Sequence, residues 1–376
     1  MAAPSVGTGV RILFATTRGA GHFGPLVPFA HASGRAGHEV LVAGPSSLAG
    51  LVARAGLPFR EVPEPPAHVV DAAFAPVWAR AASVEHVVRE LFAGLYARTA
   101  LPGMLDAVAD WRPEVVVRES MEFASAVAAE VHGVPQVRIG IHLDAEVDGA
   151  GVLEELAAPV LGLTAGRLRD APLLSRSPVA YDGVLRYRTD TPPAREPDLI
   201  YVTFGSEAPL SDHFPRVYRD AIEALADLPV LLTIGDRRDP AELGPLPPTV
   251  RVEQWVSQAE VMPRALAMVS HGGSGSTLAA LAAGVPQAFV PLFVDGPANA
   301  ERVAALGAGI AGGDLRAAVH ALLERPRYRH AARTVAAGIA ALPPIDDAME
   351  VFARVSSQAR TRVRRHYRSA AGHAIR

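Results

Sequence analysis

The 376-residue sequence contains no cysteine, which excludes disulfide bonds and cysteine-ligated metals. It contains no lysine either, so its 36 basic residues are all arginine. The apolar runs are short and interrupted by Gly, Pro or charge, and we therefore expect no membrane span. The first residues lack a basic-then-apolar signal pattern, and we expect a cytoplasmic protein. The sequence has no Asp-x-Asp triplet that would hold a cation.

What is present fits a globular chain. Hydrophobic residues make up 49% and charged residues 20%, enough to build the cores of two domains. The net charge of −3 gives no reason to expect a nucleic-acid partner. Short apolar runs alternate with amphipathic stretches of helical spacing, which indicates parallel βαβ units. In the first half we expect strands at residues 10–15, 39–43, 114–117 and 136–139, and helices at residues 25–36, 84–110 and 121–132.

A proline-rich segment then separates two similar halves. Residues 188–197, RTDTPPAREP, cannot continue a helix and are predicted to link an N-terminal lobe, residues 1–187, to a C-terminal lobe, residues 198–345. Residues 346–376 are predicted to form a helix that crosses back to the N-terminal lobe, followed by a basic, solvated tail. In the second lobe we expect strands at residues 199–204, 230–234, 250–255, 268–270 and 287–291, and helices at residues 214–226, 259–265, 276–283 and 297–306.

The most informative segment of the second half is Ser270–Pro286, SHGGSGSTLAALAAGVP, which lies between an expected strand and an expected helix. Small residues after His271 permit a tight turn, and Ser274 and Ser276 place hydroxyls near the helix start. Backbone amides and the helix dipole at such a start attract anions. We predict a phosphate or diphosphate site at Gly272–Thr277, although a plain tight turn with a serine N-cap fits the same residues.

The flanking segments carry groups suited to the rest of a nucleotide sugar. Trp255 ends an expected strand and offers a flat face to a nucleobase, although a half-buried core aromatic would give the same pattern. In PLFVDGPANAERV, Asp295 and Asn299 are placed to bind sugar hydroxyls, or Asp295 simply caps a helix. These segments follow strand ends, where doubly wound sheets bind their ligands.

The ordered motifs W-V-x-Q, H-G-G-S-G-S, G-V-P-Q, P-L-x-x-D and N-A resemble those of the family-one nucleotide-sugar glycosyltransferases, especially the bacterial enzymes that glycosylate antibiotics and polyketides. The resemblance covers nearly the whole chain and implies the two-lobed GT-B fold. It implies that Trp255 stacks on the base and that the Val256 backbone reads the base edge. It also implies a set of diphosphate and sugar contacts: Ser206, His271, Gly272, Gly273, Ser274, Gly275 and Ser276 at the diphosphate, and Asp295 and Asn299 at the sugar.

One position departs from this pattern. The family commonly has Asp/Glu-Gln where this chain has Asp295-Gly296, so the glutamine amide that contacts sugar hydroxyls is missing. A deoxygenated sugar needs fewer such contacts. We therefore hypothesise that the donor is a dTDP-linked deoxysugar rather than a UDP-hexose.

The first half contains a glycine-rich turn, TTRGAGHFGPLVP, between an expected strand and helix. An imidazole at a strand mouth, here His22, can accept the proton of an acceptor hydroxyl near neutral pH. A histidine that bonds locally to the following helix is the alternative. The pattern G-x-G-H-x-x-P resembles the family segment that carries the catalytic base, which implies that His22 is that base.

The resemblance also implies a carboxylate that orients this histidine. Glu119, in VVVRESMEFA, follows an expected strand and is the candidate, with an ordinary surface charge as the alternative and Glu122 as the fallback partner. For the acceptor, the candidate contacts are Asp144, past another strand end, and the aromatic residues Phe74 and Trp78.

Together these residues predict a metal-independent, inverting glycosyltransferase that needs no cofactor beyond its nucleotide-sugar co-substrate. His22 would take the acceptor proton while the diphosphate leaves into the turn after His271. The expected acceptor is a small hydrophobic natural product such as a polyketide aglycone. Three other functions fit parts of the pattern: carbon-glycosylation of an aromatic ring, a catalytically silent GT-B helper protein, and a two-lobed sugar-nucleotide epimerase.

Overall fold

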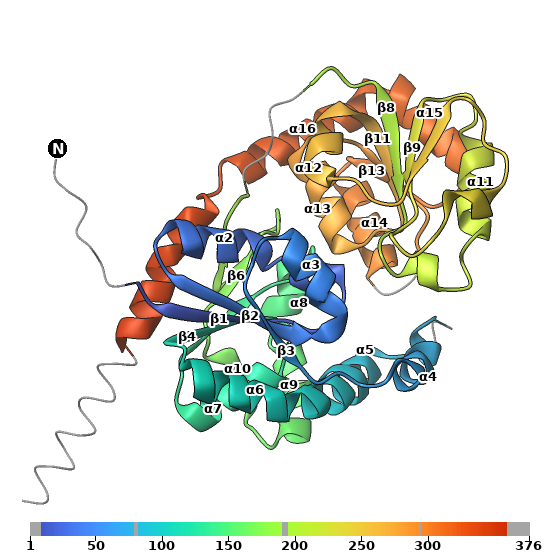
Figure 1. Ribbon diagram of the computed structural model, residues 1–376. Coiled ribbons are helices and arrows are strands. Elements are labelled where there is room, and N and C mark those ends of the chain that lie inside the picture. The colour runs from blue at the N-terminus through green and yellow to red at the C-terminus, as the bar shows by residue number, and fades with distance from the viewer. Residues whose placement is uncertain (1–8, 79–81, 190–194, 293–294, 359–376) are drawn as a thin grey trace, which may run out of the picture.

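The computed structural model describes residues 9–189, 195–292 and 295–358, except residues 79–81 and the side chain of Trp78. Each half of the chain forms a lobe in which helices cover both faces of one parallel sheet (Figure 1). Within the described residues, none of the helices combines the length and apolar character that a membrane crossing requires.

The sheet of the N-terminal lobe has seven strands in the order β3-β2-β1-β4-β5-β6-β7, and all of its pairs are parallel. Residues along the central strand point alternately to opposite faces. Leu13 contributes to one apolar cluster and Phe14 to another, so both faces of the sheet are buried. The strands are β1 (Arg11–Ala15), β2 (Glu39–Pro45), β3 (Phe59–Val62), β4 (Val115–Glu119), β5 (Gln136–Ile139), β6 (Leu173–Ser175) and β7 (Val184–Arg186).

The C-terminal lobe repeats this plan with six strands in the order β10-β9-β8-β11-β12-β13. In both lobes the first strand of the lobe lies at the centre, and the strand order reverses beside it. Ligands of doubly wound sheets bind at this reversal, outside the carboxyl ends of the strands. The strands are β8 (Leu199–Thr203), β9 (Val230–Thr233), β10 (Val250–Glu253), β11 (Ala265–Ser270), β12 (Gln287–Phe289) and β13 (Gly309–Ala311).

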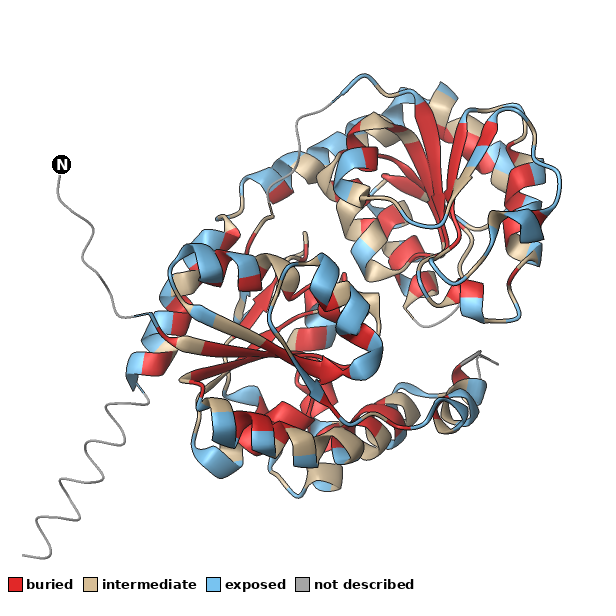
Figure 2. Cartoon of the chain, viewed as in Figure 1, coloured by how far each residue is buried: buried red, intermediate tan, exposed pale blue. Residues whose placement is uncertain are grey.

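Helices cover the sheets, and the buried strands form the centre of each lobe (Figure 2). In the N-terminal lobe these helical elements are α1 (Ala20–Phe23), α2 (Val27–Arg35), η1 (Ser46–Leu48), α3 (Ala49–Arg54), α4 (Ala67–Trp78), α5 (Val84–His86), the π-helix η2 (Val87–Tyr96), α6 (Ala97–Trp111), α7 (Ala124–His132), α8 (Ala145–Gly149), α9 (Val152–Leu161) and α10 (Ala165–Arg169). In the C-terminal lobe they are η3 (Ala208–Leu210), α11 (Arg216–Ala224), η4 (Pro240–Leu243), α12 (Gln258–Val261), η5 (Met262–Arg264), α13 (Ser274–Ala282), α14 (Gly296–Ala305), α15 (Leu315–Glu324), α16 (Pro326–Ala340) and η6 (Ile345–Ala348).

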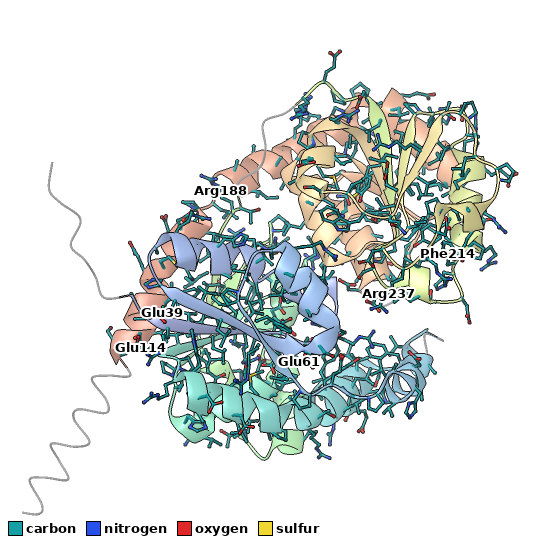
Figure 3. All side chains as sticks on the ribbon, in the orientation of Figure 1. Glu39, Glu61, Glu114, Arg188, Phe214 and Arg237 are labelled. Atoms are coloured by element: carbon teal, nitrogen blue, oxygen red, sulfur yellow. The ribbon has the colours of Figure 1, made fainter. Side chains whose placement is uncertain are left out.

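The chain passes between the lobes twice, and the two passages lie side by side. The Arg188 backbone N–H donates to the Pro343 carbonyl, and the Ile345 N–H donates to the Arg188 carbonyl. Figure 3 labels Arg188 at this junction. The chain then continues as a helix over 349–358 on the N-terminal lobe, where the rings of Phe352 and Phe14 are 6.4 Å apart.

The expected strands and helices are found in order, but the structure contains further elements. The strands β3, β6, β7 and β13 and the helices α4, α9, α15 and α16 were not predicted. The single helix expected over 84–110 is instead α5, the π-helix η2 and α6 in succession. The helix expected over 259–265 is only α12 followed by a short 3₁₀ turn.

Candidate active site

The first component of the site is a histidine–carboxylate pair in the N-terminal lobe. Gly19 turns the chain after β1 with a φ of 99°, and α1 follows at once and carries His22. His22 Nδ1 lies 3.0 Å from Glu119 Oε1 at the end of the neighbouring strand β4. The carboxylate is fully buried, whereas the imidazole keeps 21% of its surface exposed. Glu119 is therefore not a surface charge, and the alternative of a merely local bond for His22 is wrong.

Glu119 is held by several donors besides the imidazole. Its Oε1 accepts from the Thr17 hydroxyl at 2.9 Å, and its Oε2 accepts from the Met121 backbone N–H at 2.6 Å. Burial by itself would raise the pKa of Glu119, but the charge of His22 and these hydrogen bonds keep that pKa below its ordinary value. The carboxylate stays ionised, so it fixes the ring through Nδ1 and leaves Nε2 as the free nitrogen.

Aromatic and apolar side chains border this pair. The Phe92 ring, from η2, lies 5.2 Å from the His22 ring. A small pocket lies beside the turn after β1 and is lined in part by Arg18, Tyr96 and Met104. This turn leads directly into α1, which carries His22.

The other N-terminal candidates are placed as follows. Glu122 faces the same pocket but bonds to Ser125, and burial raises its pKa to about 6. Phe74 packs in the core, 6.3 Å from the Tyr96 ring. Trp78 ends α4, but its side chain lies outside the described part of the structure. Asp144 accepts from the Glu146 N–H at the start of α8 and pairs with Arg302 of the other lobe.

In the C-terminal lobe, the loop after β10 presents a tryptophan to solvent. Trp255 is 61% exposed, so the alternative of a core aromatic is wrong, and its face is free to stack. The next residue, Val256, packs against the apolar cluster below. Gln258 then donates to the Ser276 hydroxyl at 2.9 Å, which ties this loop to the start of α13.

The turn between β11 and α13 is shaped around His271. Its ring is packed between Gly205 and Gly273, where a Cβ would come within 2.7 and 2.5 Å of ring atoms. Burial lowers the pKa of His271, against the charge of Asp295 and a hydrogen bond with the Thr203 backbone, so the ring is neutral near pH 7. The backbone N–H groups of the first turn of α13 have no intrahelical acceptor. Gly275 lies in that first turn, and the exposed Ser206 directly follows Gly205, which packs against the His271 ring. This end of the lobe therefore suits an anion.

A network of side chains fixes the turn from below. The Ser274 hydroxyl donates to Asp295 Oδ2 at 2.5 Å and accepts from Asn299 Nδ2 at 3.1 Å. Asn299 Nδ2 also lies 2.8 Å from the Gly272 carbonyl and 2.9 Å from Asp295 Oδ2. Asn299 is only 4% exposed, so its amide nitrogen supports the turn. Asp295 stands at the N-terminus of α14 but makes no capping bond with its side chain.

Gly296, where the expected glutamine is missing, is fixed by the same turn. A Cβ at residue 296 would lie 2.3 Å from the His271 carbonyl oxygen. A Cβ on Gly272, whose φ is 90°, would lie 2.5 Å from the Gly296 carbonyl oxygen. The two backbones touch, so a side chain at 296 requires the turn to move.

The loops after the strand ends of the two sheets meet directly. A Cβ on Gly19, after β1, would come within 3.8 Å of the Glu207 carboxylate, after β8. Leu143, after β5, donates its N–H to the Ser274 hydroxyl at 3.0 Å, and its side chain joins the apolar cluster of the C-terminal lobe. The histidine pair of one lobe and the phosphate-type turn of the other therefore belong to one interface.

This interface holds a second histidine–carboxylate pair that the sequence analysis missed. His142 Nδ1 lies 2.7 Å from the buried Asp148 carboxylate. The signal was a histidine directly after a strand, in RIGIHLDAEVDG. Among the residues that the structure describes, no group of three or more His, Asp or Glu side chains is arranged to hold a metal ion.

Comparison with known proteins identifies the family. Residues 31–160 and 220–354 match the N-terminal and C-terminal domains of the family described as Erythromycin biosynthesis protein CIII-like. The L-demethylnoviosyl transferase of Streptomyces niveus is 34% identical over 334 residues, 80% of this chain and 84% of that protein. The elloramycin glycosyltransferase ElmGT of Streptomyces olivaceus is 33% identical over 374 residues, 89% of this chain and 94% of that protein.

A solved structure agrees with this assignment and confirms the predicted GT-B fold. The glycosyltransferase SsfS6 of Streptomyces sp. SF2575, complexed with thymidine diphosphate, matches with a TM-score of 0.76 and 25% identity. The match covers 92% of this chain and 99% of that chain. The chain therefore belongs to the Erythromycin biosynthesis protein CIII-like family of antibiotic-biosynthesis enzymes and is a glycosyltransferase with the GT-B fold.

Proposed function

We propose that this glycosyltransferase moves a deoxysugar from a dTDP-linked donor to a hydroxyl of a small hydrophobic acceptor, with inversion at the anomeric carbon. The observation that carries the proposal is the shared interface of two groups: the Glu119-held imidazole of His22, and the glycine-rich start of α13. The first suits proton removal and the second suits a departing diphosphate.

The reaction is a single displacement. The acceptor oxygen forms a bond to the anomeric carbon as its proton passes to His22 Nε2, while the bond from that carbon to the diphosphate oxygen breaks. Glu119 stabilises the imidazolium that results. The amides at the start of α13 and the helix dipole stabilise the charge on the leaving diphosphate.

Three observations support the donor. Trp255 presents a stacking face to the base, and SsfS6, a structural neighbour, is complexed with thymidine diphosphate. Gly296 supplies no amide to sugar hydroxyls, and its contact with His271 leaves no room for one. A sugar with fewer hydroxyls loses the fewest hydrogen bonds at a site that lacks this amide.

For the acceptor, the supporting observations are the pocket beside the turn after β1 and the relatives. Tyr96, Met104 and Phe123 give the pocket an apolar lining, and Arg18, Glu64 and Glu122 are its charged lining residues. The elloramycin glycosyltransferase ElmGT is named for an antibiotic product. We assign to this chain a polyketide-type aglycone as its acceptor.

The test is a transfer assay with purified protein, a panel of aromatic polyketide aglycones, and either dTDP-deoxysugars or UDP-hexoses. We expect a product only with the dTDP-deoxysugars, and its anomeric configuration, read by NMR, should be opposite to that of the donor. Retention of configuration would overturn the displacement through His22. Faster turnover with UDP-glucose than with any dTDP-deoxysugar would overturn the donor assignment.

A further inference from the structure

His142 lies in a segment of the N-terminal lobe that contacts the C-terminal lobe. Its neighbour Leu143 is 2% exposed, lies in the apolar cluster of the C-terminal lobe and donates to Ser274. The next residue, Asp144, pairs with Arg302 on α14. His142 therefore directly precedes two successive residues, Leu143 and Asp144, that contact α13 and α14 of the C-terminal lobe.

The orientation of the His142 ring is fixed from its own lobe. Asp148, on α8, is fully buried and lies 2.7 Å from Nδ1 of the ring. The same carboxylate accepts from the Ser120 hydroxyl at 2.5 Å and from the His142 backbone N–H at 3.1 Å. The ring keeps 21% of its surface exposed, the same fraction as His22. Among the described residues, Nε2 of His142 has no hydrogen-bond partner.

The charges around the ring make Nε2 a hydrogen-bond donor. Burial lowers the pKa of His142, but the charge and hydrogen bond of Asp148 outweigh it, and the charges of Asp295 and Glu119 add to the effect. The pKa of His142 is raised to about 9, so the ring is an imidazolium near pH 7. In that form both ring nitrogens carry a proton, and His142 cannot serve as a second base.

Among the described residues beside Asp295, the polar side chains have few hydrogen-bond donors to spare. Residue 296 is a glycine in backbone contact with His271. The Ser274 hydroxyl donates to Asp295 and accepts from both Leu143 and Asn299, which uses all three of its hydrogen-bonding positions. Asn299 donates to groups of the turn. A donor sugar seated next to Asp295 therefore needs a hydrogen-bond donor from the other lobe.

We propose that His142 contacts the sugar of the nucleotide donor, with Nε2 donating to a sugar oxygen, and that Asp148 positions it for this contact. The inference rests on the proposed function, because it assumes that a dTDP-sugar occupies the interface. It adds a sugar contact from the N-terminal lobe in a chain that has glycine at 296. Asp148 acts through the ring and is a positioning residue.

The experiment measures the binding of dTDP and of dTDP-L-rhamnose by titration calorimetry, with the wild-type chain and two variants. His142→Phe keeps a ring of similar shape but no donor, and His142→Gln keeps an N–H donor without the charge. We expect dTDP affinity to stay within about twofold in both variants. Affinity for dTDP-L-rhamnose should fall about tenfold in His142→Phe, the loss expected for one charged hydrogen bond, and less in His142→Gln.

Each other outcome contradicts the inference. An equal loss of dTDP and dTDP-L-rhamnose affinity would assign His142 to the diphosphate or to structure, and no loss in His142→Phe would remove it from the site. Equal effects of Phe and Gln would exclude a donated hydrogen bond. Failure of the proposed function is distinguishable, because then the wild-type chain itself binds neither dTDP nor dTDP-L-rhamnose. Unfolding midpoints of both variants, matched to wild type, verify that the comparison uses folded protein.

Discussion

The two lobes share a strand order but carry different chemistry on the edges that meet. The N-terminal edge is built from two histidine–carboxylate pairs, His22–Glu119 and His142–Asp148, whose carboxylates are fully buried. The C-terminal edge is built from glycine backbone, hydroxyls and His271, whose pKa burial lowers. One edge can hold and move protons, and the other can receive an anion without a formal positive charge.

The contrast between His142 and His271 shows how neighbours decide the charge of a residue type. Both rings are largely buried, and both sense the charge of Asp295. His142 also has a carboxylate 2.7 Å from its Nδ1, which raises its pKa, whereas glycine backbone surrounds the ring of His271. A histidine near a strand end is therefore placed to contact a ligand, and its neighbours determine whether its ring is charged or neutral.

Replacing the base should give the largest effect. His22→Ala removes the proton acceptor from the N-terminal edge but leaves the turn between β11 and α13 intact. We therefore expect the rate of sugar transfer to fall by about 10²- to 10⁴-fold. The dissociation constant of dTDP should stay within about twofold. His330→Ala, an exposed histidine on α16, is the matched control and should retain full transfer. Full transfer activity in His22→Ala would contradict the claim that the N-terminal lobe supplies the catalytic base.

A small change in the turn between β11 and α13 should instead weaken the binding of the nucleotide. The Cβ of Gly273→Ala would lie 2.5 Å from His271 Nε2 and displace the ring and the amides beside it. We expect dTDP affinity to fall about tenfold, the scale of one or two lost hydrogen bonds. Gly338→Ala in α16, where a Cβ meets nothing within 4 Å, is the control. Unchanged dTDP affinity in Gly273→Ala would place the nucleotide elsewhere.

Placing a glutamine at residue 296 tests the packing of Gly296. Because a Cβ there would lie 2.3 Å from the His271 carbonyl oxygen, Gly296→Gln should weaken dTDP binding about threefold or more, and Gly296→Ala should do the same. We expect no gain in the use of UDP-glucose, measured by transfer assay. A variant that gains UDP-glucose turnover and keeps dTDP affinity would show that the turn accommodates a side chain.

The smallest effect concerns stability, and it differs in sign between the two pairs. The pKa of Glu119 is held below its ordinary value, so its contribution is present above about pH 4.5 and is lost as pH falls through the folded value. The pKa of His142 is raised from 6.5 to about 9, so its contribution is full below pH 6.5 and is lost as pH rises through 9.

Urea unfolding at a series of pH values measures both contributions. Relative to His142→Gln, the wild-type chain should lose on the order of 1 kcal/mol between pH 6.5 and 9. Relative to Glu119→Gln, it should lose stability as the pH falls below about 4.5. Parallel pH profiles for wild type and His142→Gln would contradict the charged state of His142.

The sequence was sufficient to predict the site residues that directly follow strands, because the order of the strands determines where those residues lie. His22 and Glu119 follow strands β1 and β4, which pair directly, so a parallel sheet brings them together. Trp255 and the turn after His271 follow strands in the same way. The doubly wound plan of both lobes follows from alternating apolar and amphipathic segments.

What the sequence could not give depends on packing between segments. Asp148 reaches His142 only because α8 folds back over the end of β5, and Leu143 enters the C-terminal lobe only once the lobes meet. The burial of Asn299 beneath the turn and the contact of Gly296 with His271 are likewise properties of the assembled turn. No spacing in the sequence indicates which side chains are occupied by such contacts and are therefore not available to a ligand.

The central claim is that the start of α13 receives the diphosphate opposite the His22–Glu119 pair. A crystal structure of the chain with dTDP tests it most directly. We predict thymine stacked on Trp255, the β-phosphate at the backbone amides of Gly273–Ser276, and the open side of that phosphate facing His22. A diphosphate bound away from these amides, or on a surface from which His22 cannot be reached, would contradict the account.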